Sequence, residues 1–442
     1  MASAAEQLAA NINFSSFLKA EELKKRLMFT LGALIIYRLG TYIPLPGINI
    51  DQYQLAFNAG FGAGIGGMFN MFAGGAVERM AIFALNIMPY ISASIIMQLM
   101  TTVSPNLEKL KKEGEGGRKQ INQYTRYLTV LLASVQAYAI AVGIESFAMD
   151  PGPFFRASVV ITLVGGTMFL LWLGEQITSR GVGQGVSLII MAGIVAELPR
   201  TIAQFFELGR VGALPGFVLG GIAVLLLGTL AFIVFMERAQ RRLIVQYPKR
   251  QSGNRMMGGE TSHLPLKINT AGVIPPIFAS SLLLMPITIL SFSGQGGGPE
   301  WLTVATAWLG RGQPLYMGLY AVMIVFFCFF YTAIVFNPED TADNLKKYGG
   351  FVPGIRPGKR TAEYIDHVLT RITVVGGLYL VAVCLIPELL YGSYNLNLAF
   401  GGTSLLIMVT VTMDTVAQIQ SHLLAHQYEG LIKKSRLRGA RR

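Results

Sequence analysis

The side chains that most often carry out catalysis or bind metals are few in this chain, and their spacing suits neither task. The 442 residues include four histidines and two cysteines. His422 and His426 lie four residues apart, on one face of a helix, but no third ligand accompanies them, so a solvated surface is favoured over a zinc site. Gly62, Gly64 and Gly67 match G-x-G-x-x-G, yet no strand precedes them and no soluble helix follows. We therefore expect no enzyme activity, no metal and no cofactor.

The elements that must position any functional side chain are apolar segments long enough to cross a membrane. Hydrophobic residues make up 52% of the chain and charged residues only 14%, against about 25% charged in soluble domains. A spanning helix needs ~20 mostly apolar residues. The sequence therefore predicts an all-α membrane protein with ten spans, at residues 27–45, 79–103, 123–144, 157–177, 183–199, 213–236, 270–291, 314–336, 370–391 and 400–419.

Lysine and arginine are divided unequally between the two sides that these spans define. Of the 36 basic residues, thirty fall on the side that carries both termini, and Arg38 falls within the first span. The opposite side has five, which are Arg79, Arg156, Arg200, Arg210 and Arg311. Loops rich in Lys and Arg stay cytoplasmic. We therefore expect cytoplasmic termini, with the Arg38 side chain extending outward to the membrane surface.

Two short motifs recur five spans apart. "MPYISASII" at 88–96 is similar to "PPIFASSLL" at 275–283, and "GVSLIIM" at 185–191 is similar to "GTSLLIM" at 402–408. Because five is odd, the second half would enter the membrane from the opposite side, which gives an inverted repeat with a site between its halves. Chance similarity between apolar helices is the alternative, and the shared offset argues against it.

The repeated segments place no ionisable residue at the predicted centre. When the two copies of the repeat are aligned, Ile190 matches Ile407. Ile91 is adjacent in the sequence to the residue that matches Ile277. An ion-coupled transporter usually keeps ionisable groups or unwound backbone there, so an inverted-repeat secondary transporter is the disfavoured alternative. An aliphatic constriction could close a path to ions by excluding water. Polar residues of the second span, such as Asn86, could line such a path or equally bond one helix to another.

Two cytoplasmic loops are long and contain turn signals. The first loop, at about 238–268, includes an alternating run at 243–247 that predicts a short strand. The second loop, at about 337–370, includes two Pro-Gly pairs that predict a rigid bend with Arg356 at its tip. The positive-inside rule explains the charges but not loops of ~30 residues, since most connections are ~4–6 residues. We expect a docking surface for an acidic protein, ribosomal RNA or anionic lipid. Its basic residues would be Arg241, Arg242, Lys249, Arg250, Arg356, Lys359 and Arg360.

The stretch "GIGGMFNMFAGG" at 64–75 is too short and too glycine-rich to span a membrane, and too apolar for an exposed loop. Its larger apolar residues follow the i, i+3, i+4, i+7 pattern of one helical face, and they are Ile65, Met68, Phe69 and Phe72. Glycine costs about 1 kcal/mol relative to alanine in a helix interior. The pattern therefore predicts a short helix that is held weakly, with a re-entrant packing segment as the alternative.

Four long motifs resemble the bacterial SecY family: "IFALNIMPYISASIIMQL" (82–99), "KKEGEGGRKQINQYTRY" (111–127), "GEQITSRGVGQGVSLII" (174–190) and "FNPEDTADNLKKYGGFVPGIRPGKRTAEYID" (336–366). The resemblance covers the chain from about residue 18 and implies the channel subunit of the protein-export translocase. It implies ten helices in two inverted halves, 27–205 and 206–420, around an hourglass pore. An amphipathic cytoplasmic lead at 1–26 and a basic cytoplasmic tail at 421–442 would flank them.

The resemblance also implies roles for individual residues. The waist of the pore would be a ring of aliphatic side chains, Ile87, Ile91, Val186, Ile190, Ile277 and Ile407. Such a ring offers no hydrogen bond and no charge, so it can close around an extended chain without holding any side chain. The segment of about 60–75 would be a plug below this ring. Ser92 and Met285 would lie at a lateral gate that admits signal sequences and releases transmembrane segments.

The partners and the location follow from the same resemblance. The chain would reside in the bacterial inner membrane and form a heterotrimer with SecE and SecG. Because no nucleotide site is predicted, the SecA ATPase or a translating ribosome would dock on the cytoplasmic loops and supply the energy. Secretory preproteins with signal sequences would pass through the pore. Anionic lipids, SecDF and YidC are further candidate partners.

Overall fold

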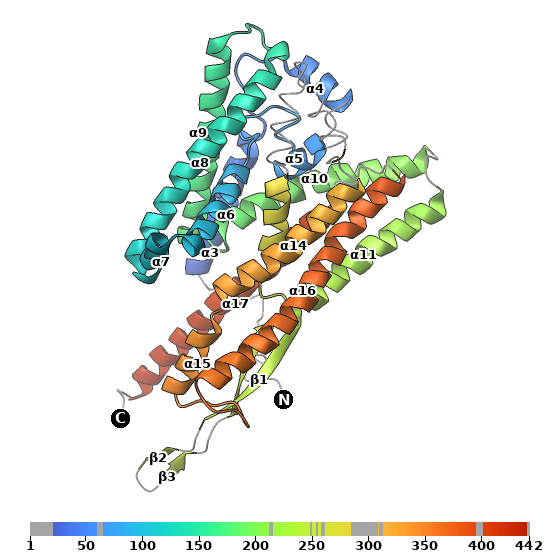
Figure 1. Ribbon diagram of the computed structural model, residues 1–442. Coiled ribbons are helices and arrows are strands. Elements are labelled where there is room, and N and C mark those ends of the chain that lie inside the picture. Colours follow the sequence, from blue (N-terminus) through green and yellow to red (C-terminus); the bar gives the residue numbers. More distant parts are fainter. Residues whose placement is uncertain are drawn as a thin grey trace. The chain divides into compact units, whose positions relative to one another are not determined.

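The computed structural model describes residues 21–59, 65–211, 215–247, 250–252, 255–257, 261–283, 308, 313–394 and 401–439. These residues form two compact units. One contains the described residues up to Gln204 and those from Ile407 onward, and the other contains those from Phe205 to Leu406. Helices dominate each unit (Figure 1).

The first unit is built from α-helices with one 3-10 turn, η2, at Glu145–Phe147. Its helices are α3 (Glu21–Gly40), α4 (Ile50–Ala59), α5 (Ile65–Phe72), α6 (Met88–Val103), α7 (Pro105–Lys112), α8 (Glu115–Gly143), α9 (Pro153–Arg180), most of α10 (Gly185–Arg210) and most of α17 (Gly402–Gly439). Helices α8 and α9 lie side by side (Figure 1). Leu163, Leu170 and Ile177 of α9 repeat every seven residues and are fully buried, so this stripe faces the core.

The second unit combines helices with two small antiparallel sheets of two strands each among its described residues. Its elements are α11 (Gly216–Arg238), β1 (Gln240–Gln246), β2 (Arg250–Ser252), β3 (Arg255–Met257), β4 (Thr261–Lys267), a helix at Ile274–Leu283, α14 (Pro314–Val335), α15 (Pro338–Lys347) and α16 (Lys359–Tyr394). Strand β1 pairs with β4, and β2 pairs with β3. Helices α14 and α16 lie side by side (Figure 1). The predicted strand at 243–247 is confirmed by β1.

Each of the ten predicted spans contains a helix, and seven helices in the described part of the chain are long and apolar enough to cross a membrane. The other three are α3, whose first two turns are highly charged, and the shorter α6 and Ile274–Leu283. The protein is therefore a multi-pass membrane protein, and the number ten stays a prediction. Proline occupies the first or second position of α6, α7, α9, α14 and α15, where its missing N–H is tolerated.

The predicted second span differs from the structure at its beginning. We expected a helix from residue 79, but α6 begins only at Met88. Met80 and Asn86 have φ angles of 42° and 49°, which a right-handed helix does not allow. The apolar residues before α6 therefore form a series of buried turns, which connect α5 to α6.

Candidate functional site

The predicted ring residues divide between the two units. Ile87, Ile91, Ile190 and Ile407 are buried in the first unit, where Val186 is half-buried. Ile277 is half-buried in the second unit. The closed ring therefore stays a prediction. Ser92 is buried in α6, and its predicted gate partner Met285 lies outside the described residues.

The predicted short helix in the glycine-rich stretch is confirmed as α5, Ile65–Phe72. The side chains of Ile65, Met68 and Phe69 lie outside the description, whereas Phe72 is buried. The role of α5 as a plug stays a prediction. Its surroundings nevertheless contain polar contacts that the sequence analysis did not foresee.

Three consecutive carbonyl groups at the end of α5 each accept a hydrogen bond from a side chain of another element. The amide of Asn86 donates to Phe72, the hydroxyl of Tyr37 donates to Ala73 at 3.4 Å, and Arg38 Nη1 donates to Gly74 at 2.5 Å. The last carbonyls of a helix have no partner within it, and a cation there also interacts favourably with the helix dipole. Arg38 Nη1 thus secures the end of α5, while Nη2 donates to the Tyr42 hydroxyl at 3.1 Å in an exposed contact, so the extension of this side chain to the membrane surface stays a prediction.

A buried carboxylate links α5 to α10. Asn70 of α5 donates to Glu78 Oε2 at 3.2 Å, and the backbone N–H of Glu78 donates to Asn70 Oδ1 at 2.9 Å. Arg200 of α10 binds both oxygens of the same carboxylate, with Nη2 at 2.9 Å from Oε1 and Nη1 on Oε2. The two planar groups thus form a bidentate ion pair, the geometry that arginine favours.

One face of α10 approaches the end of α5 over two helical turns. This face carries Gly193, Glu197 and Arg200 at the spacing i, i+4, i+7, and it begins about one turn after Ile190. A Cβ on Gly193 would lie 2.8 Å from the Phe72 carbonyl oxygen, so only glycine permits this approach. A Cβ on Gly75 would lie 2.5 Å from the Glu197 carboxylate, which places that side chain at the same point.

The electrostatics of Glu78 favour the charged form. Burial by itself raises the pKa of this carboxyl, but the hydrogen bond and charge of Arg200, the Asn70 amide and the charge of Arg79 together hold the pKa below its usual value. Glu78 therefore binds Arg200 as a carboxylate at neutral pH.

A second group of predicted site residues lies on a folded platform in the second unit. Leu243 and Leu266, from β1 and β4, are buried against the first turns of α16 together with Ile365, Val368 and Ile372. Gln246 and Phe351 exchange two backbone hydrogen bonds of 2.9 Å. The two predicted docking loops are therefore one structure, which we call the loop platform and which comprises β1, β4, α15, residues 348–358 and the first turns of α16.

The predicted bend is the exposed edge of this platform. Gly354 and Gly358 have φ angles of 82° and 106°, which glycine tolerates best. The Thr361 hydroxyl donates to the Arg356 carbonyl at 2.8 Å and ties the bend to the start of α16. Five of the predicted docking side chains are exposed, namely Arg241, Arg242, Arg356, Lys359 and Arg360. Arg250 lies in β2, and Lys249 lies outside the described residues.

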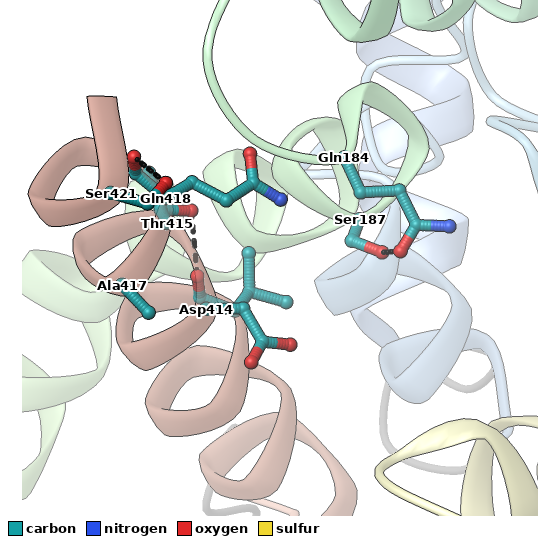
Figure 2. A pocket seen from close by; sticks show the side chains of 8 residues that line it. Gln184, Ser187, Asp414, Thr415, Ala417, Gln418 and Ser421 are labelled. Atoms are coloured by element: carbon teal, nitrogen blue, oxygen red, sulfur yellow. Dashed lines mark hydrogen bonds between the residues drawn. The ribbon is translucent and has the colours of Figure 1, made fainter. Parts of the chain in front are cut away.

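A polar groove of about 320 Å³ in the first unit was not predicted. Figure 2 shows Gln184 and Ser187 on one side of it and Asp414, Thr415, Gln418 and Ser421, all from α17, on the other. The N–H of Gly183 donates to Gln418 Oε1 at 2.9 Å and joins the two sides. Gln184 precedes the repeated "SLIIM" motif and Ser187 begins it, while the groove residues of α17 follow "SLLIM". The position of these polar residues beside the repeated motifs was the sequence signal for the groove. In the described part of the chain, no three His, Cys, Asp or Glu side chains are grouped to bind a metal.

Comparison with known proteins agrees with these observations. The SecY family model matches residues 81–416. Protein translocase subunit SecY of Pseudomonas aeruginosa is 56% identical over 422 residues, or 95% of each chain. Two solved structures share the fold. One is described as a protein-conducting channel, and it has a TM-score of 0.66 and 17% identity over 90% of this chain and 92% of that chain. The other is Sec61 in a canine ribosome–channel complex, with a TM-score of 0.63 and 17% identity over 90% of this chain and 92% of that chain. The chain therefore belongs to the SecY family.

Proposed function

We propose that this chain is the protein-conducting channel of a Sec translocase, which passes unfolded secretory polypeptides across the bacterial inner membrane. The observation that carries this conclusion is the 56% identity to a protein translocase subunit SecY over 95% of both chains. The relatives named above are translocase channel subunits, a role without a catalytic step, and they do not favour the secondary-transporter alternative.

The closed state would depend on the aliphatic ring and on α5. Four of the six ring residues are buried aliphatic side chains, which suits a waist that excludes water and ions when no chain occupies it. Helix α5 is short, as expected of a segment that must move aside. Transmembrane segments would leave sideways through a gate that includes Ser92 and Met285, where signal sequences also bind.

The energy for transport would come from partners on the cytoplasmic side. The loop platform presents Arg356 and its basic neighbours on a rigid edge, which suits SecA or the RNA backbone of a ribosome. One solved relative of this fold is described in complex with a ribosome. SecE and SecG would complete the heterotrimer, with cytoplasmic termini as the charge distribution indicates.

Reconstitution tests this function directly. The purified chain with SecE and SecG is placed in lipid vesicles, and SecA, ATP and a preprotein are added outside. We expect the preprotein to become protected from protease only when ATP and an intact signal sequence are both present. Equal protection of a preprotein without its signal sequence, or none with all components present, would contradict the proposal.

A further inference from the structure

We propose that Glu78 and Arg200 are positioning residues that hold α5 in the resting protein, so that their ion pair determines how readily α5 is displaced and how strictly signal sequences are selected. The second half of this statement rests on the proposed channel function. The first half concerns only the first unit and stands on its contacts.

The contacts show that α5 is bound at its C-terminal end through a chain of polar groups. Asn70 lies within α5 and exchanges two hydrogen bonds with Glu78, one with its side chain and one with its backbone. Arg200 in turn binds both oxygens of Glu78. A movement of α5 away from α10 must therefore break the contact of Asn70 with Glu78 or that of Glu78 with Arg200.

The exposure of the two partners makes this ion pair asymmetric. The Glu78 side chain is 12% exposed, whereas that of Arg200 is 46% exposed. If the pair opens, Arg200 regains water easily, but Glu78 becomes a buried charge without its main partner, which is strongly unfavourable. The carboxylate must then move into water, and the segment that carries it must move too. The ion pair thus resists partial opening and favours displacement of the segment as a whole.

Two further contacts, besides the ion pair, join α10 to the end of α5. Gly193 lies against the Phe72 carbonyl, and the Glu197 carboxylate lies beside Gly75. Both residues share a face of α10 with Arg200 and with Ile190, a predicted ring residue. A change in α10 near the ring would therefore reach the end of α5 through this face.

A buried thiol can report on the position of α5. Ala73 follows α5 and is 1% exposed. The chain has only two native cysteines, and both are buried. In an Ala73→Cys background, the rate of labelling by a membrane-impermeant maleimide measures how often this segment becomes accessible. The measurement uses the full chain with its partners in vesicles, without any substrate.

We compare Glu78→Gln and Arg200→Met with Arg156→Met as the matched control. Arg156 of α9 also forms an ion pair at 2.6 Å, but its partner is Glu145 of η2 rather than a residue next to α5. Loss of hydrogen bonds to a charged group should speed labelling about tenfold or more. The control should label like the parent. The exchange of the two residues, Glu78→Arg with Arg200→Glu, should restore slow labelling, which would exclude a general loss of structure.

The second measurement is export of a preprotein with a weakened signal sequence. We expect it to increase in Glu78→Gln and Arg200→Met and to return to the parent level in the exchange variant. Unchanged labelling in both single variants, or equal acceleration in Arg156→Met, would overturn the positioning role. Faster labelling without any gain in export of the weakened preprotein would overturn the selectivity. A parent that exports nothing would instead contradict the proposed channel function, and the labelling result would still be valid.

Discussion

Charged side chains are used in opposite ways at the end of α5 and on the loop platform. At the end of α5, Glu78 is buried and its partners belong to the same chain. On the platform, Arg356 and Lys359 are exposed, while the scaffold below them is held by aliphatic packing around Ile365. Buried and paired charges fix one segment of a chain against another, whereas exposed charges on a rigid scaffold are available to a partner.

The largest effect should come from reversing a charge on the platform. Arg356→Glu should reduce SecA-driven export about tenfold or more, because truncated charge contacts at interfaces typically cost 2–5 kcal/mol. Arg356→Lys should also lose activity, since lysine lacks the bidentate donor geometry. The measurement is initial export rate in vesicles. Lys111→Glu, the same charge change on an exposed residue of α7, serves as the control, and full export by Arg356→Glu would contradict the docking role.

The platform should also depend on its apolar base. Ile365 is fully buried, and Ile→Ala changes in cores typically cost about 2–5 kcal/mol. Ile365→Ala should make the loops at 240–267 and 348–358 sensitive to protease and weaken SecA binding, while the spans stay inserted. Val374→Ala, an exposed position further along α16, should change neither. If Ile365→Ala resists protease like the parent, the platform is not held by this cluster.

The seal should depend on α5 and on the ring together. Deletion of residues 62–72 should leave an inserted channel that leaks ions in bursts, because the aliphatic ring alone remains as a barrier. Adding Ile190→Ser and Ile407→Ser should increase the leak, since a hydroxyl-lined constriction stays wet. Single-channel conductance in planar bilayers, without substrate, measures both. Equal tightness of the parent and both variants would show that neither element forms the seal.

A smaller effect should follow from adding one methyl group to α10. In Gly193→Ala the new Cβ would lie 2.8 Å from the Phe72 carbonyl oxygen, so the end of α5 must shift. Overpacking typically costs about 1–3 kcal/mol, so labelling of a thiol at position 73 should become about fivefold faster or more. Gly220→Ala in α11 has open space around the new methyl group and should leave the rate unchanged. Equal rates for both would mean that the close approach does not help to hold α5.

The sequence predicted the local elements of both regions but not their junctions. The strand at β1, the short helix α5 and the bend around Arg356 were all visible because periodicity and turn residues act over a few positions. The ion pair of Glu78 with Arg200 was not predicted, because its members are 122 positions apart in the sequence. From the sequence, Arg200 was only one of the five basic residues on the side opposite the termini. The turns before α6 were missed for a related reason: the positive φ of Met80 runs against the usual preference of that residue. Asn86 tolerates a positive φ better than most residues, and that was the one local signal of a turn in this apolar stretch.

The smallest effect, and the one most specific to the buried pair, should be the pH dependence of the resting leak. The groups around Glu78 are Arg79 beside it, Arg200 and Glu197 on α10, and Tyr53 on α4. Arginine side chains in general stay charged at any pH of interest. The pKa of Glu78 is lower in the folded protein than its ordinary value of 4.5. Its stabilising contribution is therefore complete above pH 4.5 and is lost as the pH falls through the lower, folded-state pKa.

Resting conductance should accordingly be constant from pH 7 to about 4.5 and rise only below that value, where protonation of Glu78 breaks the ion pair. Glu78→Gln has no carboxyl to titrate at this position, so it should leak more than the parent at neutral pH and change less on acidification. The difference between the two proteins at each pH isolates this one group from the other carboxyls of the chain. If the difference in leak between the parent and Glu78→Gln already disappears between pH 7 and 5, the Glu78 carboxyl is not stabilised by Arg200, and the contrast between buried paired charges at the end of α5 and exposed charges on the platform does not hold.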